Sequence, residues 1–258
     1  MKYLVNTIIK ALFKIYNVIS TKLESFFLLK EKKNSNFLAE GFEFIKLGTE
    51  CNIQNFVEHT VHQNQYFHRL ILKKNSFTEI LKLIFLENNL SQYISSITGY
   101  NYSIDFALAY STAHIENENK EKSIYANLWH RDKPFSQNTL KLIIPLYKIE
   151  NNYGPMQIIN KAKSLTYTDD NINNEINLLD YIEVVGDTKT IFLFNPNICF
   201  HRAGIPDKGK IRSQLMLQLN PSKYWQFSSN LYNKQFNIEP KFPILNIFDK
   251  KIILNDKF

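Results

Sequence analysis

The sequence predicts a mostly β fold with flanking helices, in which a sandwich or jelly-roll barrel is packed by N-terminal helices. Three observations lead to this prediction. Apolar residues recur at helical spacing through much of the first hundred positions. From about residue 102 onward, short segments rich in Ile, Leu, Tyr and Phe are bounded by Asn, Gly, Pro or Asp. The 258 residues, 44% of them hydrophobic, are enough for one domain with a sizeable core.

The first thirty residues have the pattern of an amphipathic helix. Apolar residues recur at helical spacing at Leu4, Ile8, Leu12, Ile15, Ile19 and Leu23. A transmembrane helix needs about 20 predominantly apolar residues, and Lys10, Lys14 and Lys22 interrupt this segment. A signal peptide needs an unbroken apolar block and a cleavage site of small residues, which this segment lacks. We expect the helix to pack on the domain, and the alternative is a helix that lies on a membrane surface.

A second helix is predicted over residues 77–98. Ser76 and Glu79 have the spacing of a capping box, in which side chains at the start of a helix bond to its free N–H groups. Apolar residues follow at helical spacing, and Gly99 is a natural end for the helix. This helix is expected to face the core.

Eight short strands are predicted in the second half of the chain. Their segments are 103–113, 123–131, 139–149, 155–159, 181–185, 189–194, 198–202 and 211–220. Strands of this length and spacing are typical of a sandwich or a jelly roll. Residues 160–180 are expected to form a polar loop or a short helix.

The chain is expected to form a single domain in three parts. Residues 1–100 form a mainly helical layer, residues 101–222 form the β core, and residues 223–258 form a tail packed on that core. The tail contains Trp225 and the apolar run Phe242–Leu245, which favour packing over a free end.

Charge and cysteine content exclude several classes of protein. The chain has 31 Lys and Arg against 24 Asp and Glu, a formal net charge of +7. These lysines are scattered and form no basic stripe, so we expect no nucleic-acid partner. Cys51 and Cys199 lie far apart in the sequence and form neither a zinc cluster nor a disulfide framework. A reducing, cytoplasmic location is the simplest interpretation.

The segment around His130 has the pattern of a metal site. Residues i and i+2 of a strand point to the same face, so His130 and Asp132 are expected to project together. His201 lies on another predicted strand and supplies a third ligand from a distance. Two histidines and one carboxylate on one face of iron(II) leave three coordination positions open.

Arg212 follows His201 on the next predicted strand. A guanidinium inside a barrel binds a carboxylate through two parallel hydrogen bonds, and this suits the far carboxylate of 2-oxoglutarate. Gln214 shares the strand face of Arg212 and is a second candidate contact, with bonding elsewhere as the alternative. We expect Lys141 to be solvated rather than at the pocket. Cys199 is expected to be a small core residue.

Several stretches resemble the phytanoyl-CoA dioxygenase family. They are Trp-His-Arg-Asp at 129–132, Leu-Lys-Leu-Ile-Ile-Pro-Leu at 140–146, Asn-Tyr-Gly-Pro-Met-Gln at 152–157, and His-Arg-Ala-Gly-Ile-Pro at 201–206 followed by Arg212. The resemblance covers roughly residues 100–222 and implies a double-stranded β-helix, the cupin-like form of the jelly roll. It departs from the family at 160–164, where Asn-Lys-Ala-Lys-Ser replaces a Pro-Gly-Ser-His type turn.

The resemblance also implies a set of site residues and a reaction. His130, Asp132 and His201 would bind Fe(II), and Arg212 would anchor 2-oxoglutarate, which is a cosubstrate together with O2. The protein would be a dioxygenase that hydroxylates a small organic substrate and converts 2-oxoglutarate to succinate and CO2. Desaturation and ring formation use the same cosubstrates and stay open. The alternative function is a non-catalytic jelly-roll protein that binds a ligand and retains the metal motif.

Two other interpretations of the segment around His130 and Asp132 are disfavoured. His130-Arg131-Asp132 also spells the catalytic-loop triplet of protein kinases, but no Gly-rich loop precedes it and Asn138 comes one residue too late. In the iron halogenases of this type a small residue replaces the carboxylate ligand. Because Asp132 is present, hydroxylation is favoured over halogenation.

Overall fold

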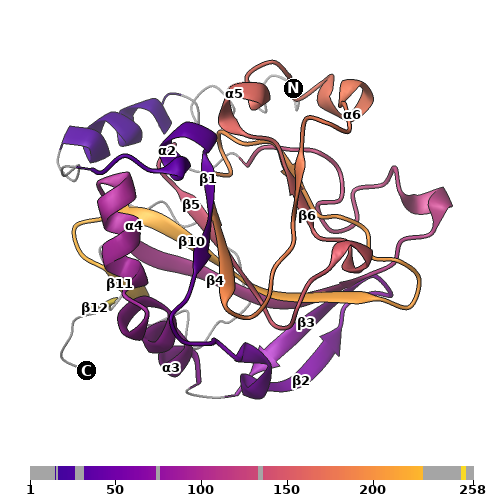
Figure 1. Cartoon of the computed structure of the whole chain (residues 1–258), viewed down its shortest axis with the longest axis horizontal. Coiled ribbons are helices and arrows are strands. Elements are labelled where there is room, and N and C mark those ends of the chain that lie inside the picture. Colours follow the sequence, from indigo (N-terminus) through magenta and orange to yellow (C-terminus); the bar gives the residue numbers. More distant parts are fainter. Residues whose placement is uncertain are drawn as a thin grey trace, which may run out of the picture.

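Two β-sheets face each other and form the frame of the protein (Figure 1). The computed structural model describes residues 15, 17–26, 32–73, 76–132, 136–228 and 251–253. The large sheet has the order β1 (Phe42–Lys46), β8 (Thr190–Phe194), β5 (Leu140–Pro145), β10 (Ile211–Ser222), β4 (Asn101–Ala113), β11 (Gln226–Ser228) and β12 (Lys251–Ile253), and β3 (Phe67–Leu72) joins β2 (Val57–His62) to β4. The small sheet has the order β7 (Ile182–Val184), β6 (Met156–Ile158) and β9 (His201–Arg202).

The helices are short and lie mainly outside the sheets. Besides the helix over residues 17–26, they are α2 (Asn36–Glu40), α3 (Ser76–Lys82), the π-helical turn η2 (Leu83–Glu87), α4 (Leu90–Thr98), α5 (Lys161–Ser164) and α6 (Ile172–Glu175), together with the 3-10 turns η1 (Ile53–Phe56), η3 (Asn117–Asn119) and η4 (Asn151–Tyr153). In Figure 1, α3 and α4 lie on one side of the large sheet, and β6 lies on the other side below α5 and α6. The predicted mostly β jelly-roll fold with flanking helices is confirmed.

Seven of the eight predicted strands are present, with ends that differ by a few residues. The predicted strand over 123–131 is wrong, since only His130 makes an isolated bridge there. Asn127 explains the difference. Its side chain accepts a bond from the N–H of Ile124 at 2.8 Å and donates to the carbonyls of Lys120 and Lys122 at 2.9 and 3.0 Å. These local side-chain bonds hold the backbone in a turn in place of a sheet ladder.

The first hundred residues contain more strand than the sequence predicts. Strands β1, β2 and β3 all lie in the region expected to be mainly helical. In β2, five of the six residues are exposed, so the strand is held by its backbone pairing with β3 and has no apolar alternation to reveal it.

The predicted helix over 77–98 is also interrupted. It begins at Ser76, and Asn89 adopts a left-handed conformation with φ 52° between η2 and α4. Gly99 ends α4 with φ 80°, as expected, and its N–H bonds to the carbonyl of Ser95.

Strand β10 separates two hydrophobic clusters because its side chains alternate between the faces of the large sheet. Leu215, Leu217 and Leu219 pack with α3, η2 and α4 in the larger cluster. On the opposite face, Met216 contacts the smaller cluster that fills the space between the sheets, made of Ile143, Met156, Ile158, Val184, Phe192, Phe194 and Cys199. Arg212 and Gln214 share the strand parity of Met216, so they face the space between the sheets.

Both ends of the described chain lie on this frame. After β10, Trp225 packs against Phe85 and Tyr102 with ring centroids 5.3 and 5.5 Å apart, and Phe227 is fully buried. The run Phe242–Leu245, expected to pack on the core, lies outside the described residues. Residues 17–26 form a helix at the other end, and none of the described helices has the length and apolar content needed to cross a membrane.

Candidate metal centre

His130 and His201 are placed side by side by their own backbones. The two residues form an isolated antiparallel bridge, with N–H to carbonyl bonds of 3.1 and 3.0 Å in the two directions. Directly opposed residues of such a pair project to the same side. Asp132 is fixed separately, because its N–H bonds to the carbonyl of Pro196 at 2.9 Å. The backbone therefore holds two of these side chains together and the third next to them.

The side chains of these three residues converge on one point. Oδ1 of Asp132 lies 3.7 Å from Nε2 of His130 and 3.7 Å from Nε2 of His201. One potential ligand atom from each residue lies within 4.8 Å of the others, and this is the one such group of three found among the residues that the structure describes. Two imidazole nitrogens and one carboxylate oxygen at this separation fit a single metal ion with open coordination positions.

Hydrogen bonds to the backbone orient both imidazoles. Nδ1 of His130 lies 2.8 Å from the carbonyl of Leu128, and Nδ1 of His201 lies 3.0 Å from the carbonyl of Cys199. A carbonyl oxygen only accepts, so each Nδ1 carries the proton and each Nε2 keeps a lone pair. Metal-binding histidines commonly have this arrangement, because the second nitrogen fixes the tautomer and the ring orientation.

The local electrostatics keep His201 and Asp132 in their ligating forms. Burial lowers the pKa of His201 to about 3, so its imidazole is neutral at pH 7. Burial alone would raise the pKa of Asp132, but the charge of Lys141 and the neighbouring histidines lower it below its usual range. Asp132 is therefore ionised. A neutral imidazole and a carboxylate are the forms that bind a metal.

Lys141 is not solvated, contrary to the expectation from sequence. Its side chain is 14% exposed and its ammonium forms an ion pair with Oδ2 of Asp132. The register of β5 explains this position, because Leu140 and Leu142 pack toward the helices and Lys141 points to the opposite face with Ile143. Lys141 occupies one carboxylate oxygen and leaves Oδ1 facing the histidines.

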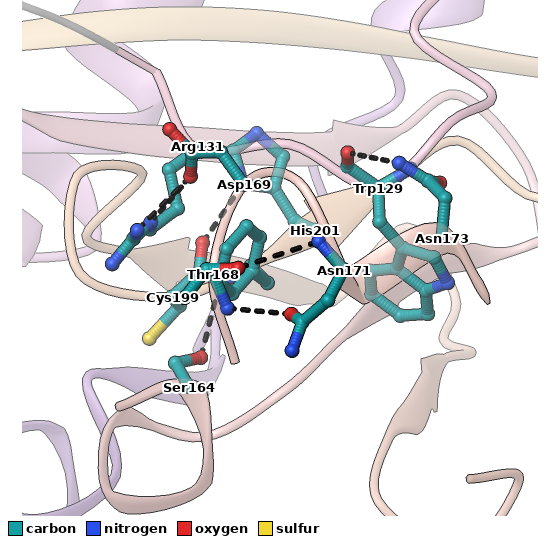
Figure 2. Close-up of polar contacts among 10 residues, drawn as sticks. Trp129, Arg131, Ser164, Thr168, Asp169, Asn171, Asn173, Cys199 and His201 are labelled. Atoms are coloured by element: carbon teal, nitrogen blue, oxygen red, sulfur yellow. Dashed lines mark hydrogen bonds and ion pairs between the residues drawn. The ribbon is translucent and has the colours of Figure 1, made fainter. Parts of the chain in front are cut away.

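The segment from α5 to α6 binds residues that are adjacent to the two histidines in sequence, and Figure 2 shows its contacts with Trp129 and Arg131. Oδ1 of Asn173 accepts from the N–H of Trp129 at 2.8 Å, and Nδ2 of Asn173 donates to the carbonyl of Trp129 at 3.2 Å. Oγ of Ser164 accepts from the N–H of Phe200 at 3.0 Å. Arg131 forms an ion pair of 2.9 Å with Asp169 of the same segment. The segment thus contacts residues adjacent to His130 and to His201.

Arg212 is fully buried and incompletely bonded. Its side chain donates from Nη1 to the carbonyls of Gly154 and Gly204. Within the described part of the chain, its Nε and Nη2 have no hydrogen-bond partner. Burial lowers the pKa of Arg212, but guanidinium stays protonated in proteins. A buried cation with two free donors is costly unless an anion joins it.

Thr112 adjoins Arg212 and was missed by sequence reasoning. The two residues are direct partners across β4 and β10, so their side chains share one face. Oγ1 of Thr112 is also buried without a hydrogen-bond partner in the described chain. Gln214, predicted to face the same ligand, is buried and donates to the hydroxyl of Tyr110. A single sequence does not reveal which strand pairs with β10, so it carried no signal for Thr112.

Cys199 and Trp129 have the surroundings expected for packing residues. Cys199 is a buried free thiol between the two sheets. Trp129 is buried with Ile159, Ile172 and Phe200, and the guanidinium of Arg202 lies 4.7 Å from its ring centroid.

Known structures share this fold at low sequence identity. The chain is similar to SnoN, a non-heme alpha ketoglutarate dependent epimerase from nogalamycin biosynthesis, with a TM-score of 0.51 and 11% identity over 72% of this chain and 80% of that chain. It is similar to EctD from S. alaskensis with bound Fe, with a TM-score of 0.51 and 12% identity over 75% of this chain and 81% of that chain. It is also similar to HygX from Streptomyces hygroscopicus with nickel and 2-oxoglutarate bound, with a TM-score of 0.50 and 10% identity over 74% of this chain and 86% of that chain.

No protein-family model matches the chain, and no curated protein sequence matches it. At these identities the likeness to solved structures shows the fold alone. The resemblance to the phytanoyl-CoA dioxygenase family therefore stays a prediction.

Proposed function

We propose that the protein is an Fe(II)- and 2-oxoglutarate-dependent dioxygenase that hydroxylates a small organic molecule. The observation that carries the proposal is the convergence of His130, Asp132 and His201 within 4.8 Å, between the same two sheets as the buried, incompletely bonded Arg212. A metal site with open positions next to a buried cation suits a cosubstrate that both chelates the metal and carries a far carboxylate.

The three ligands would hold iron through Nε2 of each histidine and Oδ1 of Asp132. The tautomers fixed by the carbonyls of Leu128 and Cys199 point the lone pairs at this position. When bound, iron with 2-oxoglutarate and O2 supplies the oxidising chemistry, which releases succinate and CO2. Lys141 balances the negative charge of Asp132 and holds its carboxylate in one orientation.

Arg212 would bind the far carboxylate of 2-oxoglutarate through its free Nε and Nη2. The hydroxyl of Thr112 adds a third donor on the same face of the sheet. The bonds from Nη1 to Gly154 and Gly204 hold the guanidinium in place before the cosubstrate arrives, so little side-chain freedom is lost on binding. Gln214 lies one position further along the same face and is a candidate contact to the cosubstrate.

The substrate is proposed to be a small molecule that approaches the exposed side of the triad. The His130 side chain is 34% exposed and that of Asp132 is 24% exposed, whereas that of His201 is 6% exposed. Access from solvent is therefore on the His130 side. Helix α6 contacts this segment through Asn173, so it is placed to contact a substrate. SnoN is described as alpha ketoglutarate dependent, EctD has bound Fe, and HygX has bound nickel and 2-oxoglutarate. The similarity of their folds to this one supports this class of chemistry.

Succinate formation tests the proposed activity without knowledge of the substrate. Purified protein incubated with Fe(II), 2-oxoglutarate, ascorbate and O2 is expected to release succinate slowly, because cosubstrate decarboxylation proceeds uncoupled in such enzymes. The His201→Ala variant should lose this activity, whereas His59→Ala, which removes an exposed histidine of β2, should keep it. If binding of metal and 2-oxoglutarate is normal and succinate is absent under all conditions, the protein is a ligand-binding jelly roll and not an oxygenase.

A further inference from the structure

The helix over residues 17–26 packs on the domain through its polar side. Ser20 is 3% exposed and bonds to Glu24 at 3.0 Å. The carboxylate of Glu24 in turn accepts from Ser136 and, at 3.3 Å, from Asn138. Oγ of Ser25 lies 3.0 Å from the hydroxyl of Tyr100. Among the described residues, these hydrogen bonds hold the side of the helix that meets the protein.

The opposite side of this helix is apolar and faces solvent. Ile15 is 56% exposed, Val18 48%, Ile19 51% and Leu23 46%. The sequence analysis expected this helix to pack on the domain, and its described part does so through the polar side, with the apolar side turned outward. Four large aliphatic side chains gathered on one helix face are unfavourable in water, since apolar surface gains free energy when it is covered. The helix lies at the outer edge of the molecule in Figure 1.

Positive charge is concentrated in the same segment. Residues 1–33 contain seven lysines and two glutamates, a net charge of 7 − 2 = +5 out of +7 for the whole chain. Lys22 is exposed beside the aliphatic residues, and Lys32 and Lys33 are exposed just beyond the helix. Glu24, one of the two glutamates, is turned inward onto Ser136. The described part of the segment thus combines an outward aliphatic face with the exposed lysines Lys22, Lys32 and Lys33.

We propose that the exposed face of this helix binds the surface of an anionic lipid bilayer. An aliphatic stripe flanked by lysines is the chemistry of helices that lie in the interface plane, where apolar side chains enter the acyl boundary and lysines contact phosphate groups. A second copy of the chain fits less well, because pairing of two such faces would bring the lysine-rich segments together. The inward hydrogen bonds of Ser20, Glu24 and Ser25 keep the helix attached while its outer face is engaged. This contact is independent of the metal centre.

Vesicle flotation of the full-length protein tests this contact. We expect the protein to float with vesicles of mixed phosphatidylcholine and phosphatidylglycerol and much less with phosphatidylcholine alone. Added salt should weaken binding, since it screens the lysines. The double variant Ile19→Glu/Leu23→Glu should bind on the order of 100-fold more weakly, at about tenfold for each aliphatic side chain withdrawn.

The matched control is Val61→Glu, which places the same charge on an exposed aliphatic position of β2. It should leave vesicle binding unchanged. Both Ile19 and Leu23 are exposed, so the double variant should melt at the wild-type temperature, which separates lost binding from lost folding. The proposal is overturned if the protein floats with neither vesicle type or if the double variant floats as well as the wild type. It is equally overturned if light scattering shows that the wild type is a dimer and the double variant a monomer, because a second copy of the chain then covers this face.

Discussion

Asp132→Ala is expected to abolish stable iron binding and with it the release of succinate. Oδ1 of Asp132 lies 3.7 Å from Nε2 of both histidines, so its loss removes the charged member of a three-residue site. Changing a residue that only supports a metal ligand costs about 10–100-fold in affinity. Loss of a ligand itself should exceed the upper end of that range. Equilibrium dialysis with Fe(II) under anaerobic conditions measures the effect directly.

The design must separate metal loss from damage to the fold. Asp132→Ala leaves the largely buried Lys141 without its ion-pair partner, and an unpaired buried charge is destabilising. The double variant Asp132→Ala/Lys141→Met removes both charges and should recover thermal stability without recovering iron. Asp207→Ala, at an exposed turn, is the control for loss of a carboxylate. Wild-type iron affinity in the double variant would show that the metal is held elsewhere.

Arg212→Met is expected to weaken 2-oxoglutarate binding while leaving iron binding near the wild-type level. Removing one partner of a buried charged pair costs about 2–5 kcal/mol, which is about 30-fold or more in affinity. The protein without cosubstrate should become no less stable, because Met replaces a buried cation whose Nε and Nη2 lack partners in the described chain. The same substitution should therefore have opposite effects on the free and the cosubstrate-bound protein.

Thermal unfolding with Fe(II), in the presence and absence of 2-oxoglutarate, measures both effects. A ligand at 100 times its Kd stabilises a protein by about 2.7 kcal/mol. The wild type should show this increase and Arg212→Met should not. Arg202→Met is the matched control, since Arg202 follows His201 on β9, points to the opposite face and bonds to Gln157 at 2.6 Å. If Arg202→Met and Arg212→Met weaken 2-oxoglutarate binding equally, the assignment of the anchor is incorrect.

The extent and the two faces of strand β10 could be predicted from the alternation of its side chains. The segment was expected over 211–220 and is observed over 211–222. Its period of two placed Arg212 and Gln214 on one face, and the structure has them opposite the leucines that pack on the helices. Face and extent follow from the residues because a strand with two different faces allows only one orientation.

His130 and Asp132 project together, as the sequence analysis expected, but not for the reason that it gave. The prediction relied on a strand over 123–131, yet Asn127 folds the preceding residues into a turn. His130 is positioned by its bridge to His201, and Asp132 by the carbonyl of Pro196. These are contacts with a segment about seventy residues away, which local patterns do not specify.

The surroundings of Lys141 and Thr112 could not be predicted from one sequence. Lys141 is largely buried with Asp132 as its ion-pair partner, and Thr112 adjoins Arg212 because β4 is the neighbour of β10. Both depend on which elements become neighbours. The same holds for the N-terminal helix. Its periodicity distinguished an apolar from a polar face, but it did not reveal that the polar face contacts Ser136 and Asn138.

A crystal structure with Mn(II) in place of iron and with 2-oxoglutarate tests the central claim most directly. The anomalous signal of manganese locates the ion without reference to any model of the chain. We expect one peak at about 2 Å from Nε2 of His130, Nε2 of His201 and Oδ1 of Asp132, with the far carboxylate of 2-oxoglutarate on the guanidinium of Arg212. A manganese peak elsewhere, or a cosubstrate whose far carboxylate does not contact Arg212, would contradict the account.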